Sequence, residues 1–132
     1  MKRVNNILVS FFLIAAFAFL PPHNNKLTGR WIIYGPDNKP AQEYVDFKKD
    51  GMYDVVLPNG EIGEAGYYKL SSSAFSIKNA KPGACGNDYW GVYKIAFHGK
   101  DSVSFVVIED SCTNRRNDIV GGNPGLKRYK KK

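Results

Sequence analysis

Short runs of aromatic and β-branched residues recur along this chain between turn residues, and this pattern constrains the fold more than any other feature. Beyond the N-terminal segment, no helix-length stretch places apolar residues at i, i+3, i+4 and i+7. Short runs of this composition are typical of strands. The sequence therefore predicts an all-β protein with strands at residues 29–34, 42–48, 52–57, 61–70, 74–78, 88–98, 102–109 and 125–129.

The turns between these strands predict how they connect. Asp50-Gly51, Asn59-Gly60, 71–73 and 99–101 have the composition of tight hairpins, so consecutive strands should pair antiparallel. In such a meander the longer links all lie at one end; these are 35–41, 79–87 and 110–124. We expect an eight-stranded antiparallel up-and-down barrel, with an open sheet or a flattened sandwich as the alternative.

The N-terminus has the features of a signal peptide. Lys2 and Arg3 precede an apolar stretch at 7–20, and Ala16-Phe17-Ala18 supplies a small-x-small cleavage site. A membrane anchor is the alternative, but the stretch is shorter than the roughly 20 residues that a span requires. We expect residues 1–18 to be removed and residues 19–132 to form one secreted or periplasmic domain, since no cysteine follows the stretch to accept a lipid.

The charge of the chain is basic, with 19 Lys and Arg against 12 Asp and Glu. Much of the excess lies at 127–132, and such a terminal run more often indicates a solvated tail than a nucleic-acid site. An exported protein also seldom meets nucleic acid, although a basic tail could bind anionic envelope lipid or polysaccharide. We therefore expect no nucleic-acid partner.

Three segments resemble a known family. Gly29-Arg30-Trp31 resembles the Gly-x-Trp motif that opens lipocalin barrels, 47–53 resembles the second hairpin of small bacterial lipocalin-like (calycin-type) domains, and 110–115 resembles their Asp-x-Cys-x-x-Arg signature. The resemblance implies a basic side chain over Trp31, and an antiparallel last strand would supply Arg128 for a cation–π contact. Lipocalins usually carry a helix before the last strand, whereas 110–124 reads as a loop with at most one helical turn.

The two cysteines are predicted to form a disulfide. The apolar positions of strands 88–98 and 102–109 face one another if paired residue numbers sum to 198 or 200 around Gly99. The numbers of Cys85 and Cys112 sum to 197, so the two lie almost opposite, just beyond the open end of this hairpin. A structural link of about 3 to 4 kcal/mol at the long-loop end follows. A redox pair is the alternative, but there is no Cys-x-x-Cys motif.

No residue pattern indicates catalysis, a cofactor or a metal. His23 and His98 are too few and too far apart for a metal site. Ser71-Ser72-Ser73 lacks a partnered base, and Glu61 with Glu64 is more typical of an exposed strand face than of a glycosidase pair. We expect a protein that is not an enzyme.

Aromatic residues on the strands indicate a binding role instead, because they offer flat apolar faces with a polar tip. The expected site is lined from the barrel interior and the long-loop rim by Tyr34, Tyr53, Tyr89, Tyr93, Phe105, Arg115 and Arg116. The two arginines could pair with an anionic ligand, or instead with Asp110 or Asp118. The expected function is a monomeric lipocalin-like binding protein for a small apolar or amphipathic ligand. The alternative is a protein-interaction or inhibitor module with a solid barrel core.

Overall fold

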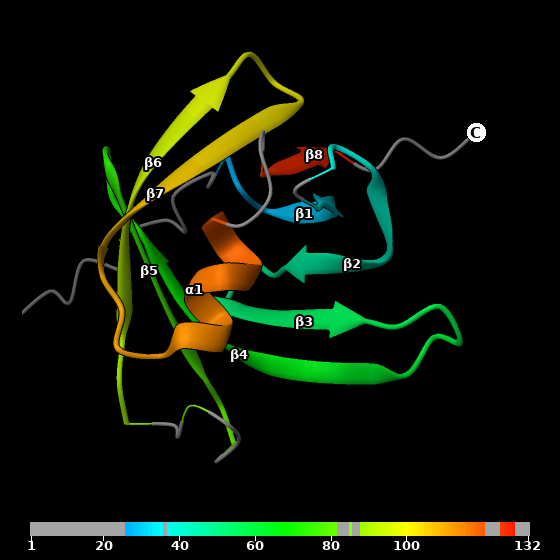
Figure 1. The fold of residues 1–132 in the computed structure, drawn as a ribbon, viewed down its shortest axis with the longest axis horizontal. Helices are drawn as coiled ribbons and strands as arrows, with labels where there is room; N and C mark the ends of the chain where they lie inside the picture. Colours follow the sequence, from blue (N-terminus) through cyan, green and yellow to red (C-terminus); the bar gives the residue numbers. More distant parts are fainter. Residues whose placement is uncertain (1–25, 36, 82–84, 86–87, 121–124, 129–132) are drawn as a thin grey trace, which may run out of the picture.

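Eight antiparallel strands close into a barrel in the computed structural model, which describes residues 26–35, 37–81, 85, 88–120 and 125–128 (Figure 1). Each strand pairs with the next along the chain, and the last pairs with the first. This order confirms the predicted up-and-down barrel over the open sheet and the sandwich. The predicted signal peptide (1–18) and the last four residues of the basic tail (129–132) lie outside the described residues. The elements are β1 (Gly29–Tyr34), β2 (Pro40–Phe47), β3 (Met52–Val56), β4 (Ile62–Leu70), β5 (Ala74–Asn79), β6 (Gly91–His98), β7 (Ser102–Glu109), α1 (Thr113–Val120) and β8 (Leu126–Arg128).

The β6–β7 hairpin has the register that the apolar pattern predicts. Ile95 pairs with Phe105 and Tyr93 with Val107, so paired numbers sum to 200. Gly99 at the turn has a φ of 67°, a left-handed conformation that favours glycine. The alternating residues of both strands therefore point into the barrel, where Tyr93, Ile95 and Phe105 are buried.

Closure of the barrel joins β1 to β8 through Trp31 and Arg128, which pair directly as expected. The Arg128 guanidinium lies 4.2 Å from the centre of the buried Trp31 ring, a cation–π contact. Arg128 also donates to the carbonyl oxygens of Thr28 (2.6 Å) and Lys26, while the indole N–H of Trp31 donates to Leu27 O at 2.6 Å. These bonds tie the start of the barrel to its last strand.

An aromatic cluster fills part of the barrel. Its centre is Phe75, which is 1% exposed and whose ring lies 5.1 Å from that of Phe105 and 5.9 Å from that of Phe47. The rings of Tyr68 and Tyr93 each lie 6.3 Å from Phe75. These are distances at which tilted or edge-on aromatic pairs attract one another.

The prediction of a loop with at most one helical turn at 110–124 is wrong, because α1 spans eight residues there. Its sequence, TNRRNDIV, has few strong helix formers and no apolar stripe, so tertiary contacts must stabilise it. Cys112 caps the helix: its Sγ accepts from Arg115 N at 3.3 Å and its carbonyl from Arg116 N at 3.0 Å. Ile119 packs against the core. In Figure 1, α1 lies over the opening of the barrel.

One strand boundary also differs in a way that matters for the site. The strand expected at 88–98 begins at Gly91, because its pairing with β5 stops at the Ile77–Gly91 pair. A side chain at Gly91 would collide with Asp110, since its Cβ would lie 2.1 Å from Asp110 Oδ2. Residues 88–90, which were expected to belong to this strand, lie outside it. No helix within the described part of the chain has the length and hydropathy that crossing a membrane requires.

Candidate functional site

A cavity of about 520 Å³ occupies the part of the barrel that the aromatic cluster leaves open. It lies below α1, at the end where the links after odd-numbered strands meet. Its volume is in the range of sites for small molecules. The apolar part of its wall comes from several strands and from α1, and consists of Ile33, Ala41, Val45, Phe47, Val55, Leu57, Phe75, Ile77, Phe105, Ile119 and Leu126.

A buried ion pair borders this cavity. Arg115 Nε donates to Asp110 Oδ2 at 2.8 Å and Arg115 Nη2 donates to Asp110 Oδ1 at 2.7 Å, in the bidentate geometry of a strong pair. The two side chains are 5% and 0% exposed, respectively. Asp110 also accepts from the Tyr93 hydroxyl and from Cys112 N (2.9 Å), so its carboxylate is surrounded by donors.

These contacts shift the pKa values of the three side chains. Burial alone would raise the pKa of Asp110, but the hydrogen bonds from Arg115, Tyr93 and the Cys112 amide together hold it below its usual value. The hydrogen bond to Asp110 raises the pKa of Arg115. Burial first, and then Asp110, raise the pKa of Tyr93. The pair therefore stays ionised, and the tyrosine neutral, across the physiological range of pH.

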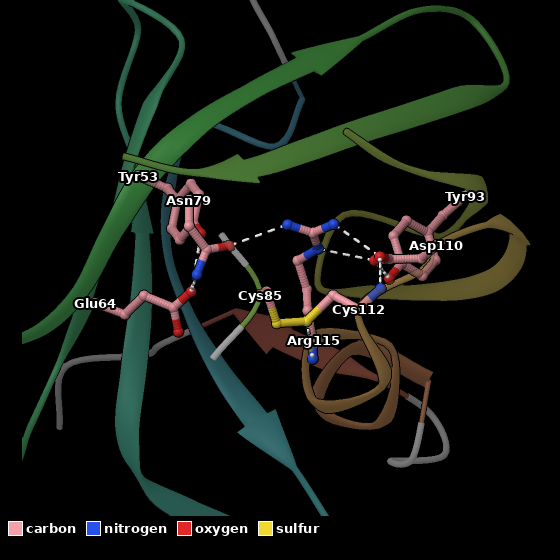
Figure 2. A network of polar contacts seen from close by, with 8 residues as sticks. All are labelled: Tyr53, Glu64, Asn79, Cys85, Tyr93, Asp110, Cys112 and Arg115. Atoms are coloured by element: carbon pink, nitrogen blue, oxygen red, sulfur yellow. Dashed lines mark hydrogen bonds and ion pairs between the residues drawn. A yellow bond between two sulfur atoms is a disulfide. The ribbon is translucent and has the colours of Figure 1, made fainter. Parts of the chain in front are cut away.

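The network continues to the far wall, as Figure 2 shows. Arg115 Nη1 donates to Asn79 Oδ1 at 3.1 Å, and the Asn79 amide donates in turn to Glu64 Oε1. The Tyr53 hydroxyl donates to the same oxygen at 3.4 Å. Burial and the nearby Glu64 raise the pKa of Tyr53. One chain of polar contacts thus links α1 to β3, β4 and β5.

The predicted disulfide is confirmed between Cys85 and Cys112. Their Cα atoms lie 5.1 Å apart, a normal separation for a disulfide. Because Cys112 also caps α1, the bond fixes the start of the helix to the segment that follows β5 (Figure 2). It lies at the long-loop end of the barrel, beside the ion pair of Arg115.

The structure brings together four of the seven residues expected at the site. Tyr34, Tyr53, Phe105 and Arg115 line the cavity. Arg115 is not available to pair with an anionic ligand, because Asp110 already neutralises its charge. Of the two acidic partners considered for this arginine, Asp110 rather than Asp118 takes the role.

The other three residues lie elsewhere. Tyr93 is fully buried behind the cavity wall, with its hydroxyl on Asp110. The expectation that Tyr89 shares the inward face of Tyr93 is wrong: Tyr89 precedes the start of β6 and is 60% exposed. Arg116 is half-buried on α1 and is not part of the cavity wall as described.

Sequence reasoning missed the acidic residues of the cavity wall, which are Glu43, Glu64 and Asp118. Glu43 could have been predicted, because it lies two residues before Val45 and four before Phe47 on β2 and therefore faces the barrel interior as they do. Asp118 could not, since its position depends on the unexpected helix. Glu43 and Asp118 line the same cavity, and burial, followed by the charge of Glu43, raises the pKa of Asp118.

Among the described residues, no group of three or more His, Cys, Asp and Glu side chains is arranged to hold a metal ion. Comparisons of the chain with protein-family models, with curated proteins and with solved structures found no match.

Proposed function

We propose that this chain is an exported binding protein that holds a small apolar or amphipathic molecule inside its barrel. The cavity of about 520 Å³ is the observation that carries this proposal. Its walls are largely aliphatic and aromatic, and its polar groups are gathered at the side of α1. Lipocalins, which the segments around Trp31 and Cys112 resemble, use a barrel interior in this way and also carry a helix before the last strand.

The chemistry of the walls sets the expected affinity. Each methylene group that moves from water into such walls contributes about 0.8 kcal/mol, or roughly a fourfold change in Kd. Binding should therefore strengthen steadily with the chain length of a ligand series until the cavity is filled.

A blocked cavity tests the proposal. Val55 lines the cavity, whereas its neighbour Val56 on β3 does not, so tryptophan at these positions gives a matched pair. With the neutral dye Nile red as probe, Val55→Trp should remove most of the fluorescence increase and Val56→Trp should preserve it. Equal binding by the two variants, with unchanged circular dichroism, would place the dye outside the barrel and count against the proposal.

Export is supported by the disulfide, since such bonds persist in oxidising compartments. It is supported independently by the Lys-Arg start, the short apolar stretch and the Ala-x-Ala site of the first 18 residues. N-terminal sequencing of protein from the envelope or medium of its host should begin near Phe19. A retained Met1 would contradict the proposal.

A protein-interaction module is the second candidate, and one observation favours it. Val106 and Ile108 are each 63% exposed on β7, and exposed aliphatic groups of this kind can mark a contact surface. The solid core assumed for such a module is at odds with the cavity. Native mass spectrometry of the protein from its host separates the two candidates, because a co-purifying small molecule supports the first and a co-purifying protein supports the second.

A further inference from the structure

The cavity wall is acidic, whereas the protein as a whole is basic. The chain has 19 basic and 12 acidic residues, yet the ionisable groups that line the cavity include three carboxylates. These belong to Glu43, Glu64 and Asp118, and they come from β2, β4 and α1. The wall is therefore acidic in a basic protein.

Arg115 does not balance these carboxylates. Arg115 lines the described part of the cavity wall, but two of its nitrogens donate hydrogen bonds to Asp110 and the third donates one to Asn79. The nearby Lys127 is not part of the described wall and lies 4.3 Å from the centre of the Tyr34 ring. A charged ligand would thus meet an excess of negative charge.

Two of the carboxylates are available to a ligand. Within the described residues, Glu43 and Asp118 make no side-chain hydrogen bond or ion pair with the protein. Glu64 is oriented by bonds from Asn79 and Tyr53, both to its Oε1 atom and both from neutral donors, so its negative charge is kept. An ammonium group at the mouth could meet carboxylates from two sides.

From these observations we infer that the cavity takes a cationic amphiphile, with an amine or quaternary ammonium head at the α1 rim and an apolar tail among the barrel walls. The cavity provides the binding site, and the carboxylates in its wall favour a ligand with a positive charge. This inference rests on the proposed ligand-binding function. It replaces the anionic ligand expected from Arg115 and Arg116, because Asp110 occupies Arg115 and Arg116 is outside the described wall.

The test compares three probes with the same tail: dodecylamine, dodecan-1-ol and dodecanoate, titrated by calorimetry below their micelle concentrations. Dodecylamine should bind about tenfold more tightly than the alcohol, which corresponds to about 1.4 kcal/mol, an amount that two partly exposed ion pairs can together contribute. Dodecanoate should bind more weakly than the alcohol. The net positive charge of the protein alone would give the opposite order for the two ions.

Charge-removing variants connect this preference to the named residues. Glu43→Gln with Asp118→Asn should lose the tenfold preference, so that dodecylamine binds no more tightly than dodecan-1-ol to this variant. The matched control is Glu109→Gln with Asp88→Asn, which makes the same change in charge at exposed residues outside the cavity wall and should retain the preference. Retention of the preference in the first variant would overturn the assignment.

The outcomes separate this inference from the function on which it depends. Binding of the alcohol with no advantage for the amine, or with an advantage for dodecanoate, overturns the cationic ligand and leaves the binding cavity in place. Binding of none of the three probes overturns both.

Discussion

Replacing Arg115 by alanine should strongly destabilise the protein. The change leaves the Asp110 carboxylate 0% exposed, with bonds from Tyr93 and the Cys112 amide but without its counter-ion. Breaking a buried pair by removing one partner typically costs about 3 to 5 kcal/mol. This is a large part of the roughly 5 to 15 kcal/mol that keeps a domain folded, and it corresponds to a fall in Tm of about 12 to 20 °C for a chain of this size.

Urea denaturation followed by circular dichroism, with the disulfide intact, measures this loss. The neighbouring Arg116→Ala is the matched control, and it should change the free energy of unfolding by no more than about 0.5 kcal/mol. Adding Asp110→Asn to Arg115→Ala should restore part of the stability, because no unpaired charge then remains buried. A loss below about 1 kcal/mol for Arg115→Ala, with no recovery in the double variant, would refute the reasoning.

Three further predictions concern the same framework. Replacing Cys85 and Cys112 with serine should cost about 3 to 4 kcal/mol in urea denaturation, since the bond closes a loop with a sequence separation of 27; an unchanged midpoint would contradict this. Because its folded pKa is lowered, Asp110 contributes stability that is present above its ordinary pKa of about 3.9 and lost as the pH falls through the folded value. Tm should therefore hold down to about pH 4 and then drop, less steeply in Asp110→Asn; equal profiles would count against the pair. Arg128→Gln should cost about 1 to 2 kcal/mol and shift the fluorescence of Trp31, whereas an unshifted spectrum would show that the cation–π contact is unimportant.

Much of the barrel could be predicted from the sequence because strand pairing depends on local patterns. The two-residue period of Tyr93, Ile95 and Phe105, with a glycine turn, determines which residues face inward. The same register predicts that Cys85 and Cys112 lie almost opposite one another, and they form a disulfide. The Trp31–Arg128 contact followed from the family resemblance together with the antiparallel order of the strands.

The candidate site could be predicted less well, since its composition depends on contacts between distant segments. Tyr34, Tyr53, Phe105 and Arg115 line the cavity, and their role in ligand binding stays a prediction, whereas the wrong strand start led to the expectation that Tyr89 lies there too. β6 begins at the Ile77–Gly91 pair, where its pairing with β5 stops, and the residue pattern alone does not show where this pairing stops.

The sequence by itself determined the number and order of the strands and the disulfide, because these follow from short-range periodicity and turn chemistry. Only the tertiary structure decided the helix, the partner of Arg115 and the acidity of the cavity. The sequence of α1 is a poor helix former, and the helix exists where Cys112, Asp110 and the core hold it. That placement brings Asp118 into the same cavity wall as Glu43, although one residue lies on β2 and the other on α1 after β7.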